Sequence, residues 1–306
     1  MVRSESPSNK PRQRFLFPGC ETIEVEKTIN VASVPQRSPF RYPGGKTWLV
    51  PRFRQWMKSF SFHPGLFIEP FAGGGVLGLT AAIESLAERV LMVELDDQVA
   101  AVWETIFSGD VSWLICQIHA FEISEDSVKK ILEQKPKNRR DLAFQTLLKN
   151  RTAHGGILAS GAGIVKNGEN GKGVHSRWYP ETIAKRISVI ESVSSKIKFV
   201  HGNAFDTIEK NKSKSNAVFF IDPPYTAGGK RAGSRLYNHS VINHDRLFSL
   251  CREIEGDFLL TYDNADEVQK MAVRYGFETR TIPMKNKHHA KLDELLIGKD
   301  LHWVDS

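Results

Sequence analysis

The feature that most limits the fold of this chain is a glycine-rich turn between a short apolar run and a helical segment. Residues 66–69 are mostly apolar and end at Glu69, and residues 73–75 are all glycine. Helical periodicity follows at residues 77–86, and a second apolar run at residues 90–94 ends at Glu94. A strand, a glycine turn, a helix and a further strand predict a parallel α/β sheet with a ligand site at the turn.

The spacing within this turn matches a cofactor fingerprint. Gly73, Gly75 and Gly78 satisfy the pattern Gly-x-Gly-x-x-Gly, and Glu94 stands 21 residues after Gly73. Glycines there let a ligand approach the backbone, and an acid at the end of the second strand can hold ribose hydroxyls. The pattern alone leaves three interpretations open: a nicotinamide dinucleotide, S-adenosylmethionine, or a tight turn with a structural role. Glu69 suits the cationic methionine moiety of the second and would repel a pyrophosphate.

The rest of the chain predicts one sheet that is interrupted by a helical segment. Further strands are expected at residues 198–201, 217–221 and 257–262, and a closing antiparallel pair at residues 277–283 and 292–297. Helical periodicity marks residues 98–106, 142–148, 183–197, 244–254 and 265–275. We therefore expect a discontinuous catalytic domain at residues 39–110 and 198–306, and an inserted helical domain at residues 111–197. Residues 1–38 are expected to form an irregular arm with one short strand near residues 22–25.

The positive charge is concentrated in the insertion. The chain has 42 Lys and Arg against 35 Asp and Glu, a net charge of +7. Residues 135–199 hold 13 basic and 4 acidic residues, so their local charge is +9 and the remainder is near −2. Such a segment is either a solvated basic face or a surface that neutralises phosphates, and charge alone does not distinguish the two.

Composition excludes several classes of protein. No apolar run approaches the roughly 18 residues of a membrane span, and basic residues interrupt the N-terminal region where a signal peptide would be apolar. Cys20, Cys116 and Cys251 lie far apart, which is typical of a cytoplasmic protein and not of a disulfide framework or a zinc module. The adjacent His288 and His289 would point to opposite faces of an extended segment, so no metal site is expected.

The segment after the predicted strand at residues 217–221 carries the chemistry. It reads Asp222-Pro223-Pro224-Tyr225 and falls at the carboxyl edge of the sheet, where α/β proteins bind ligands. The Asp222 carboxylate and the Pro223 carbonyl are two acceptors that suit an amino group with two N–H donors. The Tyr225 ring offers a flat surface to a base. The alternative is a proline-stiffened turn with a core tyrosine.

Four features follow one another in the chain: Gly44-Gly45-Lys46, the Phe-x-Gly-x-Gly turn at residues 71–75, the basic insertion and Asp-Pro-Pro-Tyr. With these features in this order, residues 39–298 resemble the Dam-like, alpha-order family of N6-adenine DNA methyltransferases. The resemblance implies a Rossmann-like S-adenosylmethionine-dependent methyltransferase sheet with an inserted, mainly helical target-recognition domain. It also implies transfer of a methyl group to N6 of an adenine flipped out of duplex DNA. Two residues depart from the family pattern: Ala72 replaces a valine, and Asn203 replaces an aspartate.

The resemblance also assigns roles to residues. Catalysis falls on Asp222, Pro223, Pro224 and Tyr225. Binding of S-adenosylmethionine falls on Tyr42, Gly44, Gly45, Lys46, Glu69, Phe71, Gly73, Gly75, Glu94, Asn203, Phe205 and Asp222. Phosphate contacts are expected from Lys149, Arg151, Lys166, Lys172, Arg177, Lys230, Arg231 and Arg235.

The family also suggests partners and leaves rival functions open. Double-stranded DNA is the expected substrate, and the protein is expected to be a monomer or weak dimer without membrane contact. The sequence leaves open whether a cognate restriction endonuclease acts separately beside it. The rivals are methylation of cytosine N4, RNA adenine or a glutamine side chain, a catalytically inactive DNA-binding relative, and a dehydrogenase. A 5-methylcytosine enzyme is disfavoured, because no cysteine in the chain follows a proline.

Overall fold

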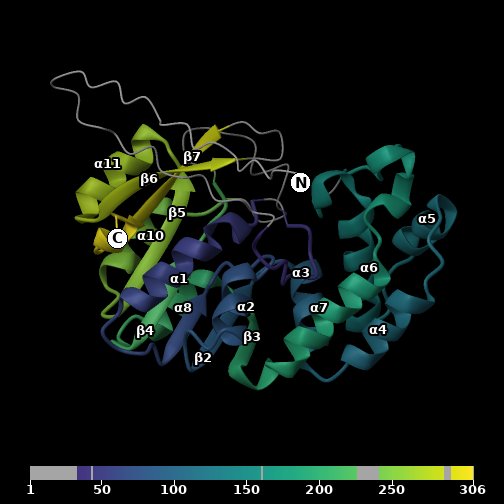
Figure 1. The fold of residues 1–306 in the computed structure, drawn as a ribbon, viewed down its shortest axis with the longest axis horizontal. Helices are drawn as coiled ribbons and strands as arrows, with labels where there is room; N and C mark the ends of the chain where they lie inside the picture. Colours follow the sequence, from purple (N-terminus) through teal and green to yellow (C-terminus); the bar gives the residue numbers. More distant parts are fainter. Residues whose placement is uncertain (1–32, 43, 160, 226–240, 286–290, 306) are drawn as a thin grey trace, which may run out of the picture.

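A seven-stranded sheet with the strand order β3-β2-β1-β4-β5-β7-β6 forms the centre of the molecule. The computed structural model describes residues 33–42, 44–159, 161–225, 241–285 and 291–305 (Figure 1). The strands are β1 (Leu66–Glu69), β2 (Arg89–Glu94), β3 (Ile197–His201), β4 (Ala217–Ile221), β5 (Asp257–Asp263), β6 (Glu278–Lys285) and β7 (Lys291–Gly298). Each strand predicted from residue 66 onward is present, and the predicted α/β class is confirmed.

The order of the strands places a switch point in the middle of the sheet. Strands β3, β2, β1, β4 and β5 are parallel, and β7 runs antiparallel between β5 and β6. Strands β2 and β3 follow β1 in the sequence and lie on one side of it, and β4 and β5 lie on its other side. Ligands of open α/β sheets bind at the carboxyl ends of the strands on either side of such a point. Here those ends carry Glu69 and, directly after β4, Asp222.

Helices cover both faces of the sheet. They are α1 (Val50–Ser59), α2 (Val76–Ile83), α3 (Asp97–Phe107), α4 (Val111–Ala120), α5 (Glu125–Glu133), α6 (Arg139–Thr152), α7 (Pro180–Ser192), α8 (Ala204–Asn211), α10 (His244–Arg252) and α11 (Asp266–Tyr275). Side chains that alternate along β4 join two different cores: Phe220 packs in a cluster with α1, α2 and α3, and Phe219 packs with α8, α10 and α11. All five residues of β4 are buried, because a strand covered on both faces needs no polar alternation.

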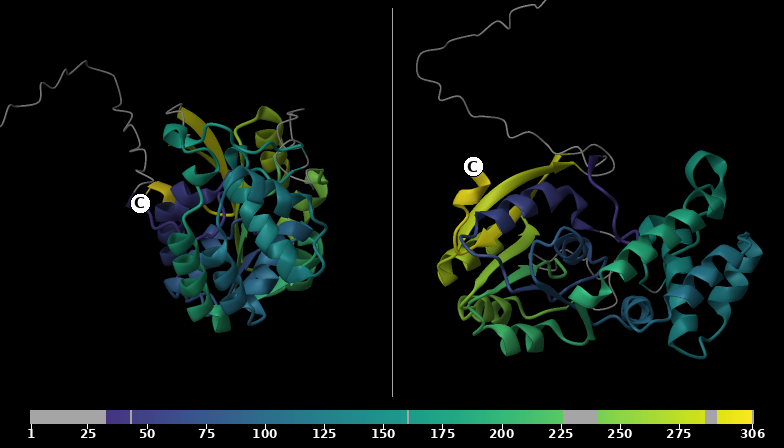
Figure 2. Two further views of the ribbon diagram at one scale, coloured as in Figure 1. Left: turned by 90° about the vertical axis from the view of Figure 1, so that its right-hand side faces the viewer. Right: turned by 60° about the horizontal axis from the view of Figure 1, so that its bottom comes forward.

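Helices α4 to α7 lie between α3 and β3 in the sequence. Helices α4, α6 and α7 pack against α3, and α5 packs against α6. Figure 1 shows α4, α5 and α6 at the end of the molecule opposite β6, and the right-hand view of Figure 2 shows the same separation. Trp178, which precedes α7, makes edge contacts with Phe121 and Phe144, with ring centroids 5.8 and 6.3 Å apart. The helical character predicted for this part of the chain is confirmed, whereas its division into a separate domain stays a prediction.

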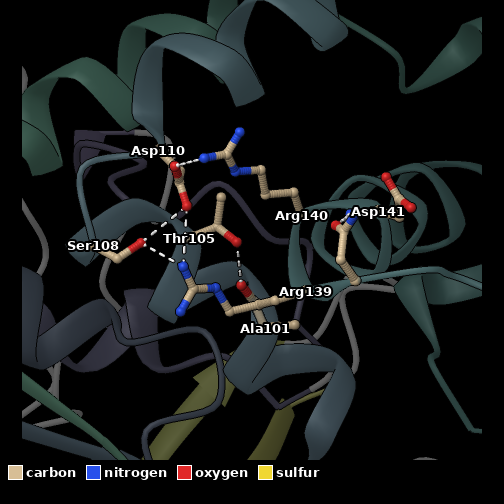
Figure 3. Close-up of polar contacts among 8 residues, drawn as sticks. Ala101, Thr105, Ser108, Asp110, Arg139, Arg140 and Asp141 are labelled. Carbon is tan, nitrogen blue, oxygen red and sulfur yellow. Dashed lines mark hydrogen bonds and ion pairs between the residues drawn. The ribbon is translucent and has the colours of Figure 1, made fainter.

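Two of the basic residues in the insertion hold helices together. Arg139 and Arg140, at the start of α6, reach Asp110 at the N-terminus of α4, with N–O distances of 3.0 and 2.6 Å (Figure 3). Arg139 also donates to the Ser108 hydroxyl. Part of the local positive charge is therefore paired with an acid of the same chain, which neither interpretation of the sequence had included.

The structure differs from the sequence analysis at several element boundaries. Helix α7 ends at Ser192, and Ile197, the last member of the predicted apolar stripe, begins β3. Helices α1 and α8 had not been predicted, and α4 and α5 lie in residues 111–197, which were predicted to be helical only as a whole. Val34 packs in the core with an exposed fraction of 5% although it lies in the segment expected to be an irregular arm. The strand expected near residues 22–25 lies outside the described residues.

Within the described part of the chain, no single helix is long and apolar enough to cross a bilayer. Helices α3 and α4 pass the length and composition test only as a pair, and the pair is bent by 113°.

Candidate active site

The carboxyl edge of the sheet gathers residues from four separate motifs. The glycine turn joins β1 to α2, Glu94 ends β2, Asp222 follows β4, and Lys46 begins the short helix η2 (Lys46–Leu49) before α1. The contacts described below connect these motifs in space. The fold thus brings together the motifs from which the site was predicted, and the roles of the single residues stay predictions.

The glycine turn is fixed by two acids and a tryptophan. The Gly73 amide donates to Glu94 Oε2 at 2.8 Å, and the Gly78 amide donates to Glu69 Oε2 at 2.9 Å. Trp103 Nε1 on α3 donates to the Gly73 carbonyl at 2.9 Å. Both Glu69 and Glu94, which the sequence had suggested as ligand contacts, therefore also hold the backbone of the turn.

Glycine is required at this turn for two physical reasons. Gly73 has a φ of +46°, a region that side chains disfavour, and a Cβ there would stand 2.7 Å from Cε1 of Tyr42. A Cβ on Gly78 would stand 2.6 Å from Glu69 Oε2. Tyr42 therefore lies directly against the glycine turn. This contact brings together two segments that the sequence had assigned separately to the cofactor.

Glu69 is a buried acid without a cationic partner. It is 4% exposed, and no Lys, Arg or His of the described ranges pairs with it. The pKa of Glu69 is raised to about 8, mainly by burial, with the charges of Asp222 and Glu94 adding to the shift and the Gly78 amide opposing it. A cation bound at this edge would relieve the repulsion. The site therefore fits S-adenosylmethionine, which carries a sulfonium and an ammonium, better than a pyrophosphate.

Glu94 is already well supplied with donors. Its Oε2 accepts from Gly73, and its Oε1 accepts from the amides of Leu95 at 2.8 Å and Asp96 at 2.9 Å. Burial raises the pKa of Glu94, while these backbone donors oppose the shift. The acid is held rigidly at the end of β2, which is the position in which a ribose would meet it.

Asp222 is held by three side-chain donors on one oxygen. Its Oδ1 lies 2.9 Å from Lys46 Nζ, 2.7 Å from the Tyr225 hydroxyl and 2.8 Å from the Thr261 hydroxyl on β5. None of the described residues donates to Oδ2. Such a carboxylate is fixed in orientation and keeps one oxygen as an acceptor for a ligand.

Two of these donors, Lys46 and Tyr225, reach a second acid, Glu294. Glu294 Oε1 on β7 lies 3.1 Å from Lys46 Nζ and 2.6 Å from the Tyr225 hydroxyl. Burial lowers the pKa of Lys46, but the charges of Asp222 and Glu294 outweigh it and raise the pKa above the usual range of lysine. Burial likewise raises the pKa of Tyr225, with both carboxylates adding to the shift. Lys46, Tyr225, Asp222 and Glu294 therefore form one network of polar contacts.

The Tyr225 ring stacks against a second tyrosine. Tyr262 on β5 stacks on it with ring centroids 5.4 Å apart and an interplanar angle of 23°. The Tyr262 hydroxyl is itself 2.7 Å from His244 Nδ1 at the start of α10. This support gives Tyr225 a defined orientation at the edge of the sheet.

The last group of predicted cofactor contacts also clusters. The side chain of Asn203 accepts from the Phe205 amide at 2.8 Å and caps α8. The Phe205 ring meets Phe71 edge-on at 6.5 Å, and the Arg246 guanidinium lies 5.3 Å above it. Asn203 is exposed and its amide nitrogen is available to an adenine edge, although its oxygen serves the helix.

Thr261 and Glu294 were missed by the sequence analysis. Glu294 directly precedes a fully buried apolar stretch of β7, and an acid in that setting is a signal that it has a polar partner inside the protein. Thr261 has no comparable signal, because threonine is common in strands.

The proposed phosphate-binding residues are placed very differently from one another. Arg151 is only 5% exposed, its guanidinium donates to the Pro39 carbonyl, and burial together with Arg186, Arg41 and Arg177 lowers its pKa to about 9. The interpretation of Arg151 as a phosphate contact is therefore corrected: it anchors the segment that leads to Lys46. Lys149 is half-buried and donates to the Leu158 carbonyl at 2.6 Å.

The other candidates are exposed, partly exposed or outside the structure. Lys166 and Lys172 are exposed in the glycine-rich segment between α6 and α7, and Arg177 is half-buried. Lys230, Arg231 and Arg235, together with His288 and His289, lie outside the described residues. Phosphate binding by the exposed lysines stays a prediction.

The strand order, the glycine turn and the Asp-Pro-Pro-Tyr segment at the switch point define a Rossmann-like methyltransferase. The profile of the D12 class N6 adenine-specific DNA methyltransferase family matches residues 42–286. The chain belongs to this family, which confirms the resemblance seen in the sequence. Membership implies S-adenosylmethionine as the cofactor.

Two solved methyltransferase structures align with most of the chain. The rRNA methyltransferase aviRa from Streptomyces viridochromogenes is 12% identical with a TM-score of 0.37, and the alignment covers 84% of this chain and 86% of that one. An rRNA methylase from Streptococcus thermophilus is 7% identical with a TM-score of 0.35, covering 83% and 97%. At these scores neither bears on the substrate. A comparison with curated protein sequences gives no significant match.

Proposed function

We propose that this protein transfers a methyl group from S-adenosylmethionine to the N6 amino group of an adenine in duplex DNA. The observation that carries the proposal is the fixed carboxylate of Asp222, whose Oδ1 accepts from Lys46, Tyr225 and Thr261. A carboxylate held in one orientation and followed by two prolines can bind an amino group and hold it in one orientation.

The chemistry demands orientation because the N6 lone pair is delocalised into the adenine ring. Asp222 Oδ2 and the Pro223 carbonyl would accept the two N–H groups and localise the lone pair on the nitrogen. S-adenosylmethionine supplies a methyl group on a positively charged sulfur. As the carbon–nitrogen bond forms and the carbon–sulfur bond breaks, N6 loses one proton, for which Asp222 is the adjacent base. Positioning of the reactants and electrostatic stabilisation lower the activation barrier, and no covalent enzyme intermediate is needed.

The base must leave the duplex to reach this edge, at a cost of a few kcal/mol. Tyr225 offers its ring for stacking, and Tyr262 already holds that ring in place. A platform that is ordered before the base arrives loses little entropy on binding, which offsets part of the cost of flipping.

Two features favour DNA adenine over the rival substrates. In the resembled families serine often opens the tetrad for cytosine N4, and asparagine opens it for glutamine and some RNA substrates, whereas this chain has Asp222. The family that matches residues 42–286 is described by its adenine-specific DNA activity. Exposed Lys166 and Lys172 near α6 and α7 would contact the DNA backbone.

The test is identification of the methylated base. Purified protein is incubated with S-adenosylmethionine labelled in its methyl group and with duplex DNA, single-stranded DNA or RNA, and the products are hydrolysed to nucleosides. We expect labelled N6-methyl-2′-deoxyadenosine from duplex DNA, none from the Asp222→Ala variant, and an unchanged result from Asp293→Ala, a control on an exposed acid of β7. Label in cytosine or only in RNA would contradict the proposal.

A further inference from the structure

Glu294 is a buried acid next to the proposed catalytic group. It is 2% exposed and lies opposite Asp263 of β5 and Ile282 of β6 in the register of the sheet. Its Oε1 contacts the two donors that also hold Asp222, namely Lys46 and the Tyr225 hydroxyl. No motif of the sequence had given it a role.

The Tyr225 hydroxyl makes short contacts with two carboxyl groups, and these contacts determine how many hydrogens lie between the three oxygens. The Tyr225 oxygen lies 2.6 Å from Glu294 Oε1 and 2.7 Å from Asp222 Oδ1. Contacts between oxygens this short each need a hydrogen between them, but a phenol carries one hydrogen and an ionised carboxylate carries none. Three oxygens in a row therefore share two hydrogens, and the second belongs to one of the carboxyl groups.

Of the two carboxyl groups, Glu294 is the more favourable site for this proton. Its side chain is 3% exposed against 23% for Asp222, and a buried carboxyl group is more stable in its neutral form. Asp222 Oδ1 also accepts from the Thr261 hydroxyl, so a proton on this oxygen would face a further donor. Burial raises the pKa of Glu294 and the charge of Asp222 adds to the shift, while Lys46 opposes it.

We propose that Glu294 is a protonated positioning residue, which donates to the Tyr225 oxygen and so turns the Tyr225 hydroxyl toward Asp222. The hydrogen bonds then run in one direction, from Glu294 to Tyr225 and from Tyr225 to Asp222. Asp222 is left as the single anion beside Lys46, with Oδ1 satisfied. Glu294 keeps its proton throughout, and no bond forms or breaks on it.

The role of this proton in catalysis rests on the proposed methyl transfer. If Glu294 lost its proton, Tyr225 would be drawn between two anions and its hydroxyl would no longer be committed to Asp222. We expect this to slow the chemical step and to leave the affinities for DNA and S-adenosylmethionine nearly unchanged. The effect should grow with pH.

Other titratable groups surround Glu294, and the experiment must separate them from it. Lys46 approaches from η2, Asp222 and Tyr225 from the segment after β4, and Asp263 from the facing position on β5. Glu69 acts on Asp222, and His244 acts through Tyr262. These groups are common to the wild type and to variants at Glu294, so the difference between pH profiles isolates Glu294.

The test compares single-turnover methylation rates of Glu294→Gln and Glu294→Leu across a range of pH, with Asp293→Asn as the neighbouring exposed control. A glutamine is neutral at every pH and its amide can donate to Tyr225. We expect Glu294→Gln to stay within a few-fold of the wild type near neutral pH and to lose the part of the alkaline decline that Glu294 causes. Glu294→Leu lacks the donor and should be slower by about tenfold. If Glu294→Gln is as slow as a variant without a donor, or its alkaline decline matches that of the wild type, Glu294 acts as an anion and the proposal is wrong.

A second readout does not depend on activity. A protonated carboxyl group gives a carbonyl stretch in the infrared that an ionised one lacks. Glu69 is also protonated at neutral pH and contributes a band of its own, which Glu69→Gln identifies. We expect a further band in the wild type and in Asp293→Asn that is lost in Glu294→Gln, even if Glu294→Leu does not fold. A wild-type spectrum that Glu294→Gln leaves unchanged would overturn the proton assignment. If the band is present but no nucleic acid is methylated, the proposed function has failed and the proton assignment stands.

Discussion

Lys46 Nζ lies 2.9 Å from Asp222 Oδ1, so an ion pair joins the segment before α1 to the loop after β4. The two residues are 176 positions apart in the sequence and belong to motifs that were identified separately. Because Lys46 is only 6% exposed, the pair lies largely inside the protein. The Lys46 ammonium therefore offsets negative charge at the site and also holds the Asp222 carboxylate in place.

Removal of the ammonium should destabilise the fold. In Lys46→Met the carboxylate of Asp222 stays near the interior without its cation, and loss of one partner of a buried pair costs about 3–5 kcal/mol. We expect a decrease of this order in the free energy of unfolding, measured by urea denaturation. Lys58→Met, at an exposed lysine of α1, serves as the control and should be unchanged. Equal stability of the two variants would show that Lys46 is not a structural cation.

Gly78→Ala tests the close approach of α2 to Glu69. The new Cβ would stand 2.6 Å from Glu69 Oε2 and 3.1 Å from Cγ of Met92. Alanine favours a helix by about 1 kcal/mol over glycine, which offsets part of an overpacking cost of about 1–3 kcal/mol. We therefore expect only a small loss of stability. Displacement of Glu69 should nevertheless weaken binding of S-adenosylmethionine, measured by calorimetry, by about tenfold, or about 1.4 kcal/mol.

Gly202→Ala is the matched control for this change. Its Cβ would meet Cγ1 of Val200 at 3.4 Å, an ordinary contact. We expect wild-type affinity for the cofactor. If both alanine variants bind equally well, the close packing of α2 on Glu69 has no part in cofactor binding.

Glu69 should make stability depend on pH. Its pKa is raised by burial from 4.5 to about 8, so between these values the folded state holds a proton that the unfolded state has released. Stability from this group is therefore full below the unfolded pKa and declines as pH rises toward the folded pKa, by at most about 1.4 kcal/mol per pH unit. Glu69→Gln should remove this part of the slope, and Glu88→Gln, at an exposed acid, should retain it. Identical slopes in the wild type and Glu69→Gln would contradict the assignment.

A cationic cofactor should reverse this protonation. A sulfonium or ammonium near Glu69 favours the carboxylate, so binding of S-adenosylmethionine at neutral pH should release protons. Calorimetry in buffers with different ionisation enthalpies measures the number released. The release should disappear in Glu69→Gln; a release of the same size in that variant would assign it to another group.

Arg151 and the exposed lysines should affect different quantities. Arg151→Met removes a buried charged hydrogen bond to Pro39 and should lower stability by about 1.5–3 kcal/mol. Lys166→Ala combined with Lys172→Ala should leave stability unchanged and reduce the slope of log affinity for DNA against log salt by about 0.9 for each lost phosphate contact. An altered salt slope in Arg151→Met at unchanged stability would restore its role as a phosphate contact.

The strands were predicted well because their signal is local. Strands β1 and β4 are short apolar runs bounded by turn residues, and both begin and end at the predicted positions. The boundary of α7 was misplaced for a related reason. Ile197 continues the apolar spacing of the helix, but a turn at residues 194–196 separates the two, and its apolar side chain serves a strand equally well.

The polar network was predictable only in part. Asp222 and Tyr225 belong to a four-residue motif, and Lys46 belongs to a glycine-rich segment, so each could be found in the sequence. The role of Glu294 depends on β7 lying beside β5, a long-range pairing that no local pattern specifies. Arg151 was misjudged because its burial depends on contact with Pro39, which lies 112 positions earlier in the chain.

The most direct test of the central claim is to map N6-methyladenine in the DNA of cells that express this chain. The account predicts methylated adenines at a defined sequence motif in cells with the wild type, and none in cells with Asp222→Ala at equal protein levels. Absence of N6-methyladenine in DNA from cells that contain folded wild-type protein, or equal methylation with Asp222→Ala, would contradict the account.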